Sequence, residues 1–241
     1  MTAFLSVQAI ALASSYGVVL ATNSFTTVRD ASATNLDGHT GTTGAHSAWT
    51  FTGGSFTGDG VFTSTVNYRI TNADGGTIDN TSRALSPNIN VDNTGPWTIT
   101  WSLTTGSSDL NVSDFSFDSY RTNSGRALQS GNGDHTNLFT AIFDIKTGGS
   151  SILGSAVSQS ISTDGPTAAA GVDSVLSLAG TTLNANTTYD FSFTASPLAN
   201  IGGYYVDVDT FSINGDVVPE PSSSSLLGLA ALCIMLRRRR D

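Results

Sequence analysis

Cysteine is almost absent from this sequence of 241 residues, since the only one is Cys233 near the C-terminus. The chain before it has no thiol, so no disulfide can hold it together, and Cys233 itself is interpreted as a small apolar residue of the tail. Glutamate is equally scarce, because Glu220 is the only one. Glycosidase chemistry usually needs two carboxylates facing a cleft, and no aspartate is singled out for such a role by its neighbours. The sequence therefore offers no catalytic candidate.

Basic side chains are also few outside the tail. Residues 22–218 contain 17 acidic and 6 basic groups, a net charge of −11. A surface that acidic repels phosphate backbones and anionic lipid, so nucleic-acid binding is excluded as a function class.

Histidine occurs at His39, His46 and His135, all within segments rich in Gly, Thr or Asn. No His-Cys or His-x-x-x-His spacing is present, so we interpret the three as loop residues and expect no zinc site. Phosphate loops, the Gly-x-Ser-x-Gly motif and a dinucleotide-binding glycine motif are missing as well.

Alternation of apolar with Ser and Thr residues is what the chain has instead. It predicts strands in seven segments, and no sustained helical period occurs before the tail. These segments are residues 61–70, 97–103, 115–117, 139–145, 172–178, 189–195 and 204–213. Turn-forming Gly, Asn and Asp residues lie between them. The pattern predicts an all-β fold, an antiparallel β-sandwich of jelly-roll type, over residues 22–217.

The last predicted strand changes parity. Tyr204, Val206 and Val208 alternate on one parity, whereas Phe211 and Ile213 lie on the other. A β-bulge near Asp209 and Thr210 would return both sets to the core, and we predict one there.

Aromatic residues are the candidates for sugar binding. Trp97 and Trp101 share the apolar parity of a clean strand, which predicts core positions. Trp49 lies near two glycines and could belong to an exposed loop platform. Tyr120, Tyr204 and Tyr205 are further candidates, and none of these aromatics forms a signature.

Asp207 and Asp209 are two residues apart, so they project from one face of the last strand. The ending Tyr-Val-Asp-Val-Asp-Thr-Phe-Ser-Ile resembles the final strand of jelly-roll carbohydrate-binding modules, in which an aspartate often helps to hold a structural Ca²⁺. The resemblance implies weak Ca²⁺ candidates at these positions, since carboxylate oxygens suit that ion. The alternative is two solvated carboxylates and no cofactor.

The N-terminal segment, residues 1–21, is apolar with small residues and predicts a secretory signal peptide. Both Ala13 and Ala21 end a small-x-small pattern that signal peptidase accepts. Lys and Arg are missing before the apolar run, so the basic n-region is missing or truncated. A buried first strand of the domain is the alternative.

The C-terminal segment, residues 218–241, has three ordered parts. Pro219, Glu220 and Pro221 form a stiff extended tripeptide, because each proline fixes φ and removes a backbone donor. Residues 222–236 are 15 uncharged residues, about 22 Å long as a helix, which predicts a short transmembrane helix. The basic residues that follow are Arg237, Arg238, Arg239 and Arg240, and the positive-inside rule keeps them cytoplasmic.

These three parts closely resemble the PEP-CTERM sorting signal of Gram-negative bacteria. The resemblance implies an exported protein that is held in the inner membrane by its C-terminal helix and cut near Pro219–Pro221 by an exosortase-type membrane protease. Asp241 after the arginines departs from the pattern, and a generic tail anchor is the alternative. Other implied partners are signal peptidase, the secretion machinery and an exopolysaccharide.

From these patterns we expect a cell-surface or extracellular-matrix protein whose domain is structural or adhesive and not an enzyme. A jelly-roll carbohydrate-binding module is the alternative, and a polysaccharide-active enzyme is third.

Overall fold

The computed structural model describes residues 17–24, 41–44, 49–60, 62–72, 83–87, 96–123, 139–161, 172–197 and 204–219. All regular structure in these ranges is β-strand, which confirms the all-β prediction. The first seven strands are β1 (Val18–Asn23), β2 (Gly41–Gly44), β3 (Thr50–Phe51), β4 (Phe56–Thr57), β5 (Phe62–Asn72), β6 (Arg83–Pro87) and β7 (Trp97–Thr105). The others are β8 (Leu110–Asn123), β9 (Phe139–Thr147), β10 (Ser150–Ser151), β11 (Val157–Ile161), β12 (Val172–Leu183), β13 (Thr188–Pro197) and β14 (Tyr204–Val217).

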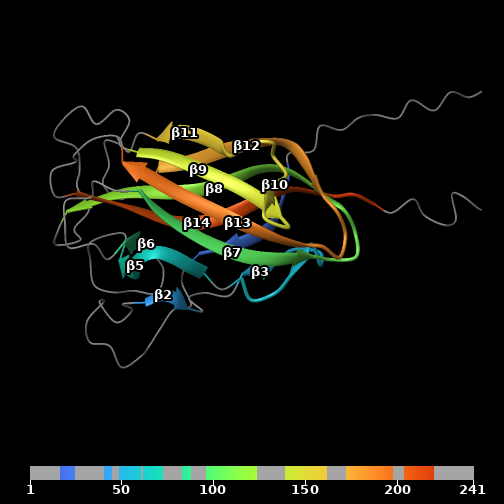
Figure 1. Cartoon of the computed structure of the whole chain (residues 1–241), viewed down its shortest axis with the longest axis horizontal. Coiled ribbons are helices and arrows are strands. Elements are labelled where there is room, and N and C mark those ends of the chain that lie inside the picture. The colour runs from blue at the N-terminus through green and yellow to red at the C-terminus, as the bar shows by residue number, and fades with distance from the viewer. Residues whose placement is uncertain are drawn as a thin grey trace, which may run out of the picture.

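The strands pair antiparallel in two facing layers (Figure 1). One layer contains β12, β8, β14, β1 and β3 in that order, and the other contains β9, β13, β7 and β5. Strand β6 pairs with both β5 and β14, so it joins the layers along one side. Antiparallel layers that face each other in this way form a β-sandwich, as the sequence predicts.

Alternation along the strands decides which side chains fill the space between the layers. In β7 the buried residues follow every second position, beginning at Trp97, and the residues between them are Thr and Ser. Burial of one parity gives each strand an apolar inner face and a hydroxyl-bearing outer face. Strand periodicity therefore places most of the core residues.

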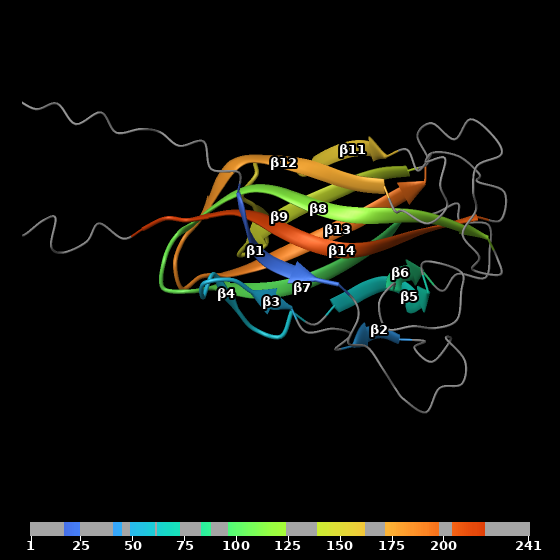
Figure 2. The same ribbon diagram turned by 180° about the vertical axis from the view of Figure 1, so that it is seen from behind.

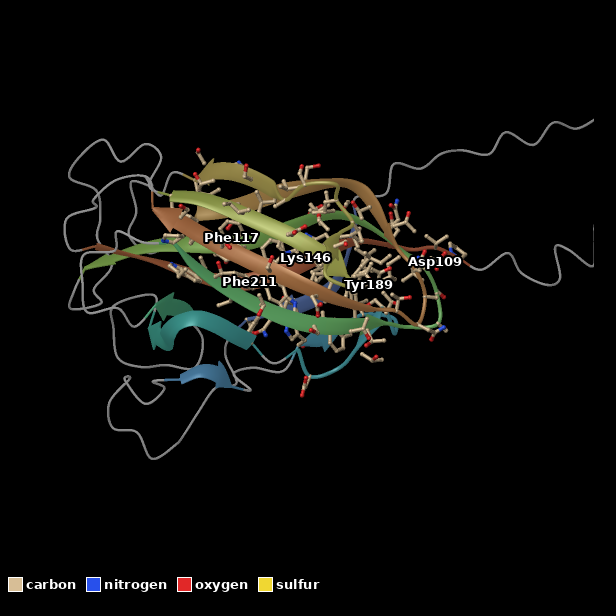
Figure 3. The ribbon with its side chains drawn as sticks, viewed as in Figure 1. Asp109, Phe117, Lys146, Tyr189 and Phe211 are labelled. Atoms are coloured by element: carbon tan, nitrogen blue, oxygen red, sulfur yellow. The ribbon has the colours of Figure 1, made fainter. Side chains whose placement is uncertain are left out.

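Trp101 lies at the centre of an aromatic core. Six rings have centroids 5.5–6.2 Å from its own, and they come from both layers: Trp49, Phe62, Phe115, Phe143, Phe191 and Phe211. Its indole Nε1 is buried without a hydrogen-bond partner, so packing and not polar contact holds this ring. Phe117, whose ring centroid lies 6.0 Å from that of Phe115, extends the same core along the sandwich (Figure 3).

The predicted bulge in the last strand is confirmed. The register between β14 and β8 shifts between Asp209 and Ser212, and Thr210 has a φ of 49°. Val208 before the shift and Phe211 and Ile213 after it are all fully buried. The extra residue thus keeps both halves of β14 turned toward the core.

Strand β1 overlaps the end of the predicted signal segment. Leu20 and Ala21 are buried, and β1 pairs along β14 from Val18 to Asn23. The Ser55 hydroxyl donates a 2.6 Å hydrogen bond to the Leu20 carbonyl, which ties β1 to the loop before β4. The first described strand of the sandwich therefore begins at Val18, inside the range assigned to the signal segment, and residues 1–16 of that segment lie outside the described residues.

Candidate functional site

The sorting motif follows directly on a core strand. β14 ends at Val217, and the Val218 N–H still donates a 2.8 Å hydrogen bond to the carbonyl of Asp109, at the start of β8. Pro219 is the next residue and the last that the structure describes. Glu220, Pro221 and the arginines 237–240 lie outside the described residues. No linker therefore separates the folded sandwich from the sorting motif.

The predicted transmembrane helix, residues 222–236, also lies outside the described residues. Within the part of the chain that the structure describes, no helix is long and apolar enough to cross a membrane.

Both ends of the described chain leave the sandwich at the same end (Figure 2). β1 begins where β14 finishes, because the two strands are antiparallel neighbours with Val18 opposite Gly215. Asp109 lies at this end as well (Figure 3). A Cβ on Gly17 would come 2.8 Å from the Ser113 hydroxyl on β8 and 3.0 Å from the Gly215 nitrogen on β14, so the chain before β1 is packed closely against both strands.

The tryptophans lie in the core. Burial of Trp97 and Trp101 confirms their predicted positions. The prediction of an exposed loop platform at Trp49 is wrong, because the Trp49 side chain is 6% exposed and stacks on Trp101 with a centroid separation of 5.5 Å. Its indole N–H donates a 3.2 Å hydrogen bond to the carbonyl of Gly60, where a Cβ would collide with the indole. The side chains of Tyr120, Tyr204 and Tyr205 lie outside the described residues.

The outer face of β7, β13 and β9 is rich in hydroxyl groups, a feature the sequence reasoning did not single out as a site. Thr98 bonds to Thr194 at 2.7 Å, and Thr104 bonds to Thr188 at 2.8 Å, each across the β7–β13 ladder. Between these pairs the Ser102 hydroxyl donates a 2.6 Å hydrogen bond to an Asp190 carboxylate oxygen. The Ser and Thr alternation was visible in the sequence, whereas the pairing of these two strands was not.

Asp144 borders this hydroxyl face on β9. Its carboxylate accepts hydrogen bonds from the Ser151 hydroxyl at 2.6 Å and from the Ile145 N–H at 2.9 Å. Lys146 approaches the other carboxylate oxygen at 3.7 Å. These contacts fix the β9–β10 hairpin, so Asp144 serves the fold and is only 8% exposed.

An acidic pair lies on the opposite layer. Asp118 on β8 and Asp173 on β12 are directly opposite in the ladder. Burial, followed by the hydrogen bond and charge of Asp173, raises the pKa of Asp118 to about 6, and a hydrogen bond from Thr210 opposes the rise. Two carboxyl groups that share a proton in this way are a pH-sensitive feature of the sheet.

The Ca²⁺ candidates, Asp207 and Asp209, lie on β14, the strand that pairs with β8 beside this acidic pair. Asp209 is opposite Asp118 and Asp207 is opposite Tyr120, but the side chains of both candidates lie outside the described residues. Among the side chains that the structure does describe, no three His, Cys, Asp or Glu residues come together as a metal site. Calcium binding stays a prediction of the sequence. A thermal unfolding midpoint that does not change on addition of EDTA would contradict this prediction. His39, His46 and His135 also fall outside the described ranges.

Comparison with known families identifies the tail. Residues 217–240 match the family described as the PEP-CTERM protein-sorting motif. This match confirms the resemblance of the tail, and the chain carries this sorting signal directly after β14. No curated protein matches the sequence significantly.

Solved structures share only a distant likeness. A cyclase from Fischerella sp. TAU is 10% identical with a TM-score of 0.38, over 64% of this chain and 77% of its own. A structure titled for promiscuous carbohydrate-binding modules of the β-sandwich superfamily is 12% identical with a TM-score of 0.29, over 70% of this chain and 58% of its own. An Arthrobacter globiformis T6 isomalto-dextranase complexed with panose is 9% identical with a TM-score of 0.35, over 82% of this chain and 33% of its own. With TM-scores this low, none of them bears on the function of this chain.

Proposed function

We propose that this chain is an exported protein whose β-sandwich has a non-catalytic, structural or adhesive role at the cell surface or in an extracellular polysaccharide matrix. The PEP-CTERM signal marks an exported protein with a membrane-anchored C-terminal sorting signal that is processed by an exosortase, a membrane protein.

In this proposal the N-terminal segment directs the chain to the secretion machinery and is removed by signal peptidase. The helix over residues 222–236 then holds the protein in the inner membrane with Arg237–Arg240 in the cytoplasm. Cleavage near Pro219–Pro221 releases the sandwich, which moves to the surface or the matrix.

The observation that carries the adhesive role is the hydroxyl face of β7, β13 and β9. Its Ser and Thr side chains are held in cross-strand pairs, as the 2.7 Å Thr98–Thr194 contact illustrates. A face of fixed hydroxyl groups suits many weak hydrogen bonds to a hydrated, neutral polymer. Tight recognition of a single sugar usually needs an exposed aromatic platform, and all three tryptophans of the chain are buried.

Retention in the matrix of the native cells tests this role. Thr100 is an exposed residue of the hydroxyl face, so Thr100→Arg places a bulky charged side chain across it. We expect the fraction of protein retained after washing to fall several-fold. Ser177→Arg is the matched control, because Ser177 is exposed on β12 in the other layer and its substitution should leave retention unchanged. Equal retention of both variants and the wild type would refute an adhesive role for this face.

The mass of the C-terminus in native cells, with and without the exosortase, tests the sorting steps. We expect a mature end near Pro219–Pro221 that depends on the protease. An intact arginine tail in both strains would mean a permanent anchor instead.

The alternative function is a carbohydrate-binding module, and the carboxylate of Asp190 on the hydroxyl face favours it. Asp190 is exposed and accepts a hydrogen bond from the Ser102 hydroxyl at one carboxylate oxygen, so the carboxylate can accept further hydrogen bonds from sugar hydroxyls. Saturable binding on a glycan array that Asp190→Asn abolishes would establish this function. Hydrolysis of a polysaccharide by the purified chain would instead overturn the non-catalytic proposal.

A further inference from the structure

Exposed large apolar side chains gather at one end of the sandwich. Among the described residues, five such side chains are exposed, and Val175 on β12 is the one that lies elsewhere. The other four are Val18 (53% exposed), Val19 (40%), Val217 (37%) and Val218 (40%), which we call the exit patch.

Strand pairing brings the exit patch together. Val18 on β1 is opposite Gly215 on β14, and Val217 is two residues further along β14. Residues related in this way are diagonal neighbours on one face of a sheet, about 7–8 Å apart. Val19 is the next residue of β1 and so projects to the opposite face of the sheet, and Val218 follows directly on β14. The four valines therefore border this end of the sandwich on both faces, although the two strands are some 200 residues apart in sequence.

The exit patch is held rigidly. Val217 pairs with Leu110 on β8, and the Val218 N–H bonds to the carbonyl of Asp109 at 2.8 Å. A Cβ on Gly215 would approach the Cα of Val112 to 2.8 Å, so β14 and β8 are closely packed here. The last strand therefore cannot swing away from the body of the sandwich without breaking its ladder.

The short connection to the tail fixes where this end of the sandwich must lie. This step rests on the proposed function, in which residues 222–236 are inserted in the inner membrane. Three residues lie between Val218 and Ser222, so their Cα atoms are four steps apart and at most about 14 Å from each other. While the tail is uncut, Val218 thus lies within about 14 Å of the start of the anchor, and the packing of β14 holds the rest of the exit patch beside it.

The negative charge of the sandwich decides which class of lipid headgroup the exit patch can face. Asp109 and Asp216 flank the exit patch, and residues 22–218 carry a net charge of −11. Anionic headgroups would be repelled by these carboxylates, whereas zwitterionic headgroups are not. We propose that the exit patch is a lipid-contact surface, by which the sandwich rests on the zwitterionic outer surface of the inner membrane until the tail is cut.

Depth-dependent fluorescence quenching of the full chain tests the proposal. The protein is reconstituted in vesicles of phosphatidylethanolamine and phosphatidylcholine that contain doxyl-labelled lipid. Its single cysteine, Cys233, is labelled with a fluorophore and reports insertion of the tail. In the Cys233→Ser background, Val217→Cys and Val19→Cys place the label in the exit patch. Val175→Cys is the matched control, because Val175 is an exposed valine outside the exit patch. It lies opposite Ser116 on β8, six residues from Leu110, which pairs with Val217.

We expect quenching at positions 19 and 217 to be at least twofold greater than at position 175, with strong quenching at position 233. Quenching at 233 with equal, weak quenching at 19, 217 and 175 would overturn the lipid contact while leaving the anchor intact. Absence of quenching at 233 would overturn the anchor and, with it, this inference. If the labels at positions 19 and 217 become shielded from solvent only after the exosortase is added, the exit patch contacts the protease and not the lipid. This result would overturn the lipid contact.

Discussion

Asp118 on β8 and Asp173 on β12 face each other across the antiparallel ladder, and their carboxyl groups form a hydrogen bond. Such a bond requires a proton on one of the two groups. Strand β12 pairs only with β8 among the described strands, so this contact joins a strand at the margin of its layer to the rest of the sheet.

The pH dependence of stability follows from that pair. The pKa of Asp118 rises to about 6 in the folded protein, above the usual value of 3.8, so the folded state binds this proton more tightly than the unfolded chain does. The contribution is fully present below about pH 4 and is lost as the pH rises through about 6. We expect Asp118→Asn to raise the unfolding temperature by about 2–4 °C at pH 7.5 and to change it little at pH 4. Thermal unfolding from pH 4 to pH 8 checks this.

A control variant distinguishes the effect of the Asp118–Asp173 pair from the effect of removing any one negative charge. Asp59→Asn removes one negative charge at an exposed loop position away from β8 and β12. It should retain the wild-type pH profile. An Asp118→Asn protein with the wild-type profile would show that the shared proton does not govern stability.

The bulge at Thr210 makes a sharp prediction for deletion. Removing Thr210 shifts the parity of β14, so either Val208 or the pair Phe211 and Ile213 must turn to solvent. Exposing fully buried side chains of this size costs about 2–5 kcal/mol, and we expect the deletion variant to be largely unfolded. Thr210→Gly keeps the residue count and accepts the positive φ, so its stability should lie within about 1 kcal/mol of the wild type. Urea unfolding of both variants checks the pair, and equal stability of the two would contradict the role of the bulge.

Tryptophan fluorescence tests the burial of the three tryptophans. The three tryptophans, Trp49, Trp97 and Trp101, are 6%, 1% and 2% exposed. We expect a blue-shifted emission maximum and weak quenching by acrylamide in the native protein. In urea the maximum should shift to the red, and the acrylamide quenching should rise several-fold. Addition of polysaccharide should leave the emission unchanged. A substantial acrylamide-accessible fraction in the native protein would show that one of these rings is at the surface.

The mature N-terminus is predicted by the packing of β1. Cleavage after Ala21 would remove Leu20 and Ala21, which are buried at 1% and 0% exposure. Cleavage after Ala13 leaves β1 whole, and its start at Val18 remains paired with β14. We therefore expect the exported protein to begin at Ser14, which intact-mass measurement checks. A mature protein that begins at Thr22 and is as stable as one that begins at Ser14 would show that β1 is dispensable.

The sequence by itself determined the periodic features of this protein. Alternation predicted the strands that became β5, β7, β8, β9, β12, β13 and β14, and the parity change at Asp209 and Thr210 predicted the bulge. Period-two burial is a local property of a strand, so it can be read before any pairing is known. The order of the Pro-Glu-Pro, apolar and arginine parts likewise predicted the sorting signal, which the family match at residues 217–240 confirmed.

The tertiary structure alone decided which residues meet. Short strands such as β3 and β4 carry no periodic signal, and β1 has a continuous apolar run that a signal segment shares. The sequence around Trp49 predicts a loop residue, whereas in the fold Trp49 stacks on Trp101. The Asp118–Asp173 pair, the hydroxyl face and the exit patch each unite residues far apart in the chain. Register between distant strands depends on the simultaneous burial of all their inner faces, and no single segment contains that information.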